Sequence, residues 1–214
     1  MKIRTQSNFL NALNDEFLWR HKELLDFRFY ARTTNSIFSK TLIRAGVPLA
    51  YAHWEGFVKN GTELLLNFVS HQGLKNIELA DVYYVNSIKN NLTTLQTAHR
   101  SVAAISAACL IRDSHEALAK ISHKNFVDTS SNLSSDVFEQ LASSIGISTA
   151  AYLHLYPYID ESIVNQRNKI AHGEYLQLDL ANFHALTDRV SDLLRMYKTD
   201  LENKVIDGSF RKKT

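Results

Sequence analysis

Apolar residues recur at intervals of three, four and seven along most of the chain, which is the period of one face of an α-helix. The first such stretch predicts a helix over roughly residues 6–33, and the second predicts one from about 40 to 71, before Gly73. Pro48 lies inside the second stretch, where it removes a backbone hydrogen bond and kinks the helix unless the helix begins there. The chain is therefore predicted to open with two long amphipathic helices.

Weaker helical patterns follow. Residues 76–91 are predicted to form a shorter or broken helix, and residues 101–122 a further one. Residues 129–135, TSSNLSS, have the polar composition of a connecting loop. The last helix is predicted to start at Asp179, whose side chain can cap its first turn, and to continue to about Leu201.

Two shorter helices are predicted between these segments. Ser134 or Ser135 caps the first of them, and Gly146 ends it. Pro157 or Asp160 begins the second, which is the helix before the last one. The whole pattern predicts an all-α bundle of amphipathic helices.

Composition supports a single helical domain. Seven glycines and two prolines among 214 residues leave few turns, and an apolar content of 45% suffices for one substantial core. We predict one domain over residues 1–214, with a frayed basic tail from about residue 207.

Charge and cysteine usage favour a cytoplasmic protein. Residues 1–13 are too polar for a signal peptide, and the longest apolar run, residues 102–111, is far short of the roughly 20 residues that span a membrane. The single cysteine, Cys109, excludes a disulfide framework within the chain and is expected to be a buried, reduced thiol. A formal charge of +2 permits a nucleic-acid partner without requiring one.

The segment NQRNKIAHGEY combines an arginine, an amide, a histidine and a helix-ending glycine. Arg167 and His172 fall in the last turns of a helix that Gly173 ends. Residues five apart are separated by about 140° on a helix with about 3.6 residues per turn. The two side chains therefore converge only if the helix end unwinds, if the arginine wraps round, or if a second chain contributes its copy. The alternative is structural, since cations in a last turn complement the helix dipole by about 0.3–1 kcal/mol each.

Other chemistries have little support in the sequence. None of the nine histidines has the spacing that aligns metal ligands on one helical face, and one cysteine cannot build a zinc site. A glycine-rich phosphate loop is missing as well. We therefore predict no metal and no cofactor, while a Ser-His-Asp arrangement of distant residues stays open.

Arg167, Asn168 and His172 resemble the Arg-polar-x3–5-His motif of the ribonuclease members of the HEPN superfamily, which are all-α domains. Residues 49–59, LAYAHWEGFVK, resemble the second-helix signature of a bacterial HEPN subgroup found near restriction, toxin and abortive-infection genes. Asn132 and the short helix after it resemble the segment that precedes the motif helix in that subgroup. The resemblance covers about residues 40–200, and it implies a HEPN-like bundle with the motif on the penultimate helix, a dimer and an RNA-directed activity.

Residues of the second-helix segment have two interpretations. Trp54 and Phe57 are expected in the core rather than as stacking platforms. Glu55 and Lys59, four residues apart, suit an exposed ion pair worth about 0.3–0.5 kcal/mol. Alternatively, Glu55 lies near the motif helix and orients Arg167 or His172.

Metal-independent RNA cleavage suits the motif residues. The substrate's own 2′-hydroxyl is the nucleophile, so the protein has to transfer protons and neutralise charge on phosphorus. His172 suits the first task and Arg167 the second, with Asn168 and Lys169 as supporting groups. In-line cleavage benefits from an acid and a base, and one motif contributes one histidine. A homodimer with a composite cleft supplies both.

The predicted function is a metal-independent endoribonuclease, acting as a toxin or phage-defence effector and leaving a 2′,3′-cyclic phosphate. The alternative is a catalytically silent HEPN module that binds RNA, a nucleotide or a partner such as a nucleotidyltransferase antitoxin. Tyr175 is a candidate for modification by such a partner or for RNA contact, although its spacing from His172 differs from the His-x-Tyr form of related toxins. A plain helical scaffold is the third possibility.

Overall fold

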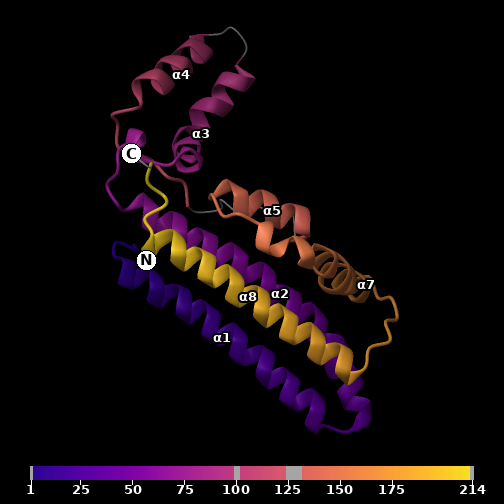
Figure 1. Ribbon diagram of the computed structural model, residues 1–214. Helices are drawn as coiled ribbons and strands as arrows, with labels where there is room; N and C mark the ends of the chain where they lie inside the picture. Colours follow the sequence, from indigo (N-terminus) through magenta and orange to yellow (C-terminus); the bar gives the residue numbers. More distant parts are fainter. Residues whose placement is uncertain (1, 99–101, 124–131, 213–214) are drawn as a thin grey trace.

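Three long helices form the body of the protein. In the computed structural model, which describes residues 2–98, 102–123 and 132–212, α1 (Gln6–Thr33) and α2 (Ser36–Ser70) form an antiparallel hairpin. The last helix, α8 (Leu180–Ile206), packs against both (Figure 1). Thr5, Asn35 and Asp179 each accept a backbone hydrogen bond that caps one of these helices.

The first and last helices match the predictions closely, and α2 is longer than predicted. Since α2 begins at Ser36, Pro48 lies in the helix interior and does not start it. The predicted segment 76–91 is a 3₁₀ turn over Asn76–Glu78 followed by α3 (Asp81–Thr97).

The predicted helix over residues 101–122 was wrong in its second half. Helix α4 (Val102–Asp113) ends where Ser114 turns the chain, and its hydroxyl donates to the Ile111 carbonyl. Turns over residues 114–116 follow, and the chain then pairs with the segment after α2 through a bridge between Lys75 and Leu118. These contacts join residues distant in sequence, so helical periodicity gave no sign of them.

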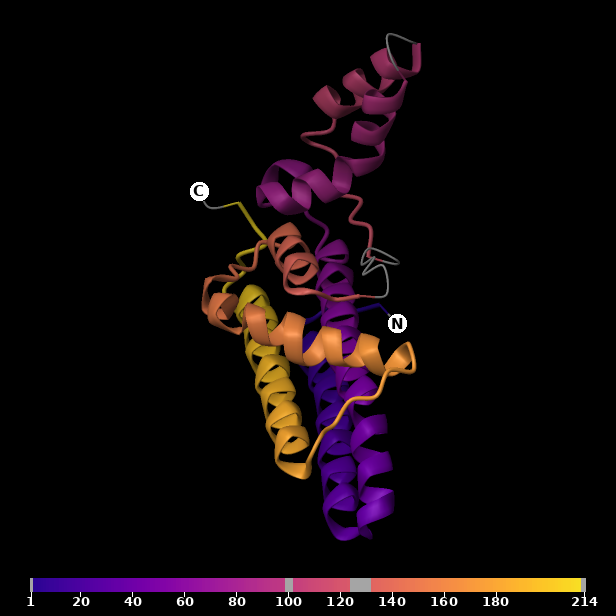
Figure 2. The ribbon, with the colours of Figure 1, turned by 90° about the vertical axis from the view of Figure 1, so that its right-hand side faces the viewer.

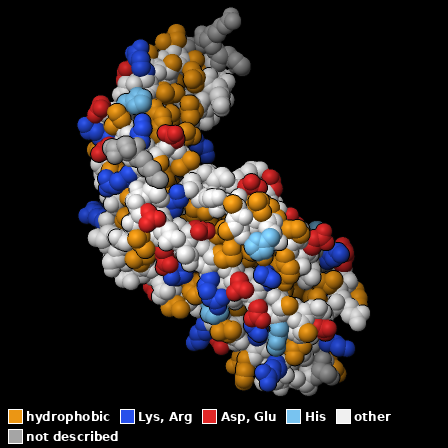
Figure 3. All heavy atoms as spheres, viewed as in Figure 1, with side chains coloured by type: hydrophobic (Ala, Val, Ile, Leu, Met, Phe, Trp, Pro, Cys, Tyr) orange, Lys and Arg blue, Asp and Glu red, His pale blue; other side chains and the backbone are white. Residues whose placement is uncertain are grey.

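Helices α3 and α4 pair with each other and form an arm that projects from the bundle (Figures 1 and 3). Cys109 lies on this arm and is only half-buried, which corrects the expected buried thiol. The surface seen in Figure 3 mixes both signs of charge, in keeping with the net charge of +2.

The predicted fraying of the tail from residue 207 was also wrong for the part of the tail that the structure describes. Phe210 is buried at 3% exposure and lies against Phe68 of α2, with ring centroids 5.6 Å apart. Its carbonyl accepts from Ala80, and Lys212 donates to Glu78. The backbone thus leaves α8 and attaches to the base of the arm.

Aromatic side chains join the short helices to the bundle. Phe138 of α5 (Ser135–Ser144) lies between α2 and α8, with its ring centroid 5.1 Å from Trp54 and 5.6 Å from Tyr197. Trp54 and Phe57 are both fully buried, so their predicted place in the core is confirmed. Ser134 caps α5, while residues 129–131 of the predicted loop lie outside the described residues.

The motif helix is the last part of a continuous helical segment with changing geometry. A 3₁₀ turn (Ala150–Leu155) leads through α6 (Tyr156–Tyr158) and π-helical turns (Ile159–Asn165) into α7 (Gln166–Ala171). This segment crosses α2 and α8 at a steep angle (Figure 2). The motif is therefore carried by the penultimate helix, as predicted.

Candidate functional site

The end of α7 has a fully formed Schellman turn. Gly173 donates to the Ile170 carbonyl at 3.1 Å and Glu174 donates to the Lys169 carbonyl at 2.9 Å. Gly173 has φ of +79°, a left-handed conformation that a side chain would strain. His172 is the last residue before it, and its backbone N–H bonds to the Asn168 carbonyl at 2.9 Å. The histidine is thus exposed on a geometrically fixed helix end.

Arg167 points in another direction, towards α2. Its Cζ lies 4.5 Å from the ring centroid of Tyr51, and its Nη1 donates to Oδ1 of Asn168 at 2.8 Å. A guanidinium over an aromatic face is held by about 0.5–2 kcal/mol, depending on solvent exposure. Arg167 is therefore oriented by one neighbour in its own helix and by one aromatic ring beneath it.

Tyr51 is the centre of this arrangement. Its ring is 2% exposed, and its hydroxyl accepts from the Leu133 N–H at 2.8 Å and hydrogen-bonds to Glu55, one helical turn further along α2. Burial, assisted by the charge of Glu55, raises the pKa of Tyr51 to about 12, so the phenol stays neutral at physiological pH. Three separate segments of the chain thus meet at the ring that supports Arg167.

Asp160 anchors the start of the motif segment. Its two carboxylate oxygens accept from the backbone N–H of Ser135 at 2.7 Å and from the Ser135 hydroxyl at 2.6 Å. The π-helical turns therefore attach to the first turn of α5. Such turns occur often at functional sites, and these seven residues, which lie two to eight positions before Arg167, set which side of α7 faces α2.

The structure brings only part of the predicted site together. Arg167 and Asn168 are in contact, and Glu55 reaches them through Tyr51. His172 is placed one turn away on the exposed helix end, and the part of the chain that the structure describes contains no hydrogen bond between its ring and Arg167. Within one chain, therefore, neither an unwound helix end nor an arginine wrapped round the helix joins Arg167 to His172.

Lys169 and Tyr175 take peripheral positions. Lys169 is half-buried, and its backbone carbonyl is the acceptor of the Schellman turn. Tyr175 lies beyond that turn and is 86% exposed. Sequence reasoning missed Tyr51, although its place four residues before Glu55 on one helical face could have indicated it.

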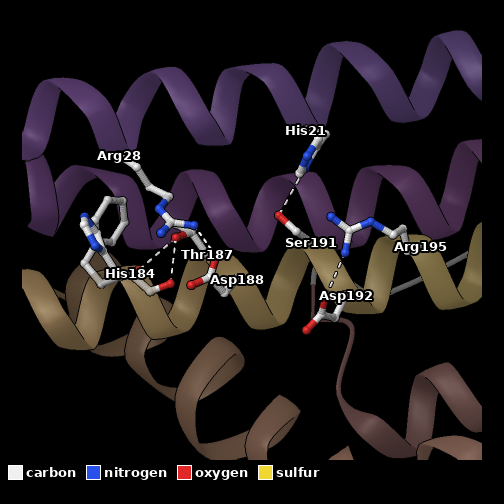
Figure 4. Close-up of polar contacts among 9 residues, drawn as sticks. His21, Arg28, His184, Thr187, Asp188, Ser191, Asp192 and Arg195 are labelled. Carbon is white, nitrogen blue, oxygen red and sulfur yellow. Dashed lines mark hydrogen bonds and ion pairs between the residues drawn. The ribbon is translucent and has the colours of Figure 1, made fainter.

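A second polar cluster, between α1 and α8, is structural (Figure 4). His21 Nδ1 lies 3.3 Å from the Ser191 hydroxyl, but the neighbouring carboxylates pair with arginines, Asp188 with Arg28 and Asp192 with Arg195. Burial and the nearby arginines lower the pKa of His21. This histidine and serine therefore meet without the aligned carboxylate that a triad requires.

The described residues contain no group of three or more metal-ligating side chains placed to hold an ion. No helix among them is both long and apolar enough to cross a membrane.

Comparison with known proteins identifies the family. The family model described as RiboL-PSP-HEPN matches residues 15–203, which is most of the chain. The chain belongs to the HEPN family. No curated protein and no solved structure matched significantly.

Membership agrees with the all-α fold of the described residues. The HEPN family is known for ribonuclease-type function, and the matched region contains every residue of the Tyr51–Arg167 arrangement and His172. The resemblance of residues 49–59 to one HEPN subgroup stays a prediction. Within this HEPN chain, neighbouring residues of that segment face different parts of the structure. The Glu55 side chain hydrogen-bonds to Tyr51, whereas Gly56 faces α1, because a Cβ at this position would lie 2.6 Å from the Arg20 guanidinium.

Proposed function

We propose that this HEPN protein is a metal-independent endoribonuclease in which His172 transfers protons and Arg167 neutralises the charge that develops on phosphorus. The observation that supports this most strongly is the placement of Arg167, a permanent cation held on the buried Tyr51 ring, one helical turn before an exposed histidine on a fixed helix end.

The proposed reaction is an in-line transfer within the RNA. A base removes the 2′-hydroxyl proton, the 2′-oxygen attacks the adjacent phosphorus, and the 5′-oxygen leaves with a proton from an acid. The products are a 2′,3′-cyclic phosphate and a 5′-hydroxyl. Asn168 and Lys169 assist, because Asn168 already bonds to Arg167 and Lys169 adds a cation in the same helical turn.

The active unit we propose is a homodimer with a composite cleft. Arg167 faces α2 while His172 lies on the exposed end of α7, so a second chain placing its own motif helix alongside would bring Arg167 of each chain to His172 of the other. We further propose that the enzyme acts in the cytoplasm as a toxin or phage-defence effector, with an antitoxin or defence-system protein as partner.

Purified protein is expected to cleave RNA at full rate in excess EDTA, because neither the nucleophile nor the proton transfers require a metal. The measurement is gel analysis of a labelled oligonucleotide, with the product ends identified by mass spectrometry as cyclic phosphate and 5′-hydroxyl. Activity that vanishes with chelator and returns with magnesium would rule out this mechanism, and 3′-hydroxyl products would do the same.

Replacing Tyr51 with leucine is expected to slow cleavage by about 2- to 30-fold, the kinetic equivalent of a lost cation–π contact. Tyr51→Phe retains the ring and should lose less. Tyr83→Leu is the matched control, since Tyr83 is equally buried but bonds to the Ile145 carbonyl. Both leucine variants should lower the melting temperature, so equal slowing of cleavage by both would show that Tyr51 has no particular role in positioning Arg167.

A further inference from the structure

A groove of about 780 Å³ begins where the motif ends. One wall is the N-terminal half of α2, including Lys40 and Arg44, and the other is the loop from Tyr175 to the start of α8. Figure 2 shows this loop running from the end of α7 down to the start of α8. Arg44 Nη2 donates to the Glu174 carbonyl at 2.6 Å, which places the upper end of the groove two residues after His172.

The charged groups in the groove favour an anion. Lys40 and Arg44 lie one turn apart on α2, and Arg44 has used one of its five N–H donors. The one carboxylate in the lining is that of Asp179, the residue that caps α8. It accepts a hydrogen bond from the backbone N–H of Asn182, in the first turn of that helix, at 2.7 Å. The helix dipole there offsets part of its charge.

An aromatic side chain completes the lining. Tyr175 is 86% exposed, more than any other large hydrophobic residue among those described. Exposed aromatic rings beside cations are what proteins use to bind single-stranded nucleic acid, because bases stack on the ring while the cations contact the backbone. A volume of this size is ample for one nucleotide.

We propose that this groove binds one nucleotide of single-stranded RNA next to the phosphate cleaved at His172. Its base stacks on Tyr175, and its phosphates contact Lys40 and Arg44. The assignment rests on the proposed ribonuclease function, since that function makes RNA the substrate. It extends the site from the reacting phosphate to a neighbouring position that determines where on the strand the enzyme acts. Arg44 then has two tasks, holding the loop through Glu174 and contacting the substrate.

The test measures binding separately from cleavage. Fluorescence anisotropy with a 2′-O-methyl RNA oligonucleotide, which cannot be cleaved through its 2′-oxygen, reports affinity alone. Tyr175→Ala is expected to raise Kd by about 5- to 150-fold, the range for one lost stacking contact, and Tyr175→Phe to leave it unchanged. Lys40→Gln is expected to reduce the slope of log Kd against log salt by about 0.7, the value for one phosphate contact on a single strand.

Matched controls come from exposed residues of the same types on α1. Tyr30 is 61% exposed and Lys22 is exposed, so Tyr30→Ala and Lys22→Gln should bind as the wild type does. With cleavable RNA, the groove variants should raise KM more than they lower kcat. Wild-type affinity in both Tyr175→Ala and Lys40→Gln would overturn the proposal, as would a wild-type protein that does not bind the oligonucleotide. If the groove variants lose affinity as expected but the wild-type protein cleaves no RNA, the ribonuclease function is refuted and the groove remains an RNA-binding site.

Discussion

His172→Ala is expected to reduce the rate of RNA cleavage by about 10²- to 10⁴-fold, the usual contribution of a general acid or base. The side chain is exposed and its backbone N–H supplies the helix-ending bond to Asn168, so alanine keeps that bond. Stability should change by no more than about 0.5 kcal/mol, as is usual for surface substitutions. The measurement pairs single-turnover cleavage with thermal unfolding of the same preparation.

His154→Ala is the matched control, because His154 is also exposed and lies in the 3₁₀ turn of the same helical segment. Its cleavage rate should equal that of the wild type. If His172→Ala cleaves at the wild-type rate, His172 is not the proton-transfer group. If its rate falls only in proportion to a loss of folded protein, the motif is structural.

The sequence allowed the long helices to be predicted because each buries a continuous apolar face, which leaves a regular signal. Phe9, Leu13 and Phe17 of α1, for example, recur with helical spacing and are all buried. The motif was recognisable for a related reason, since Gly173 marks a helix end through a conformation that favours glycine. Local patterns therefore gave the fold class and the position of the candidate site.

The remaining features depend on contacts between distant segments. Tyr51 supports Arg167 only because the chain folds α7 across α2, more than a hundred residues away in sequence. The π-helical turns also make the sequence pattern misleading. They hold more residues per turn than the about 3.6 of an α-helix, so every later side chain points in a different direction from the one that an α-helical pattern predicts. The direction in which Arg167 points was therefore not predictable from the sequence.

Because Arg167 points away from His172 of its own chain, the two groups of one cleft in the proposed dimer can come from different chains. A dimer that pairs Arg167 of one chain with His172 of the other has two clefts, each built from both chains. We therefore consider a heterodimer of one Arg167→Ala chain and one His172→Ala chain. Under this arrangement, one cleft carries both substitutions and the other carries neither.

Such a heterodimer, isolated through two different affinity tags, is expected to recover about half of the wild-type rate, because one of its two clefts is intact. Each mutant homodimer should be slower by about 10²-fold or more, since both of its clefts lack a catalytic group.

A heterodimer of wild type with His172→Ala is the control: independent clefts retain about half of the activity, whereas a cleft that needs both histidines loses nearly all of it. Full activity in a monomer at any concentration would contradict the composite cleft. Failure of the Arg167→Ala and His172→Ala heterodimer to recover, together with half activity in the control, would place Arg167 and His172 of one cleft in the same chain.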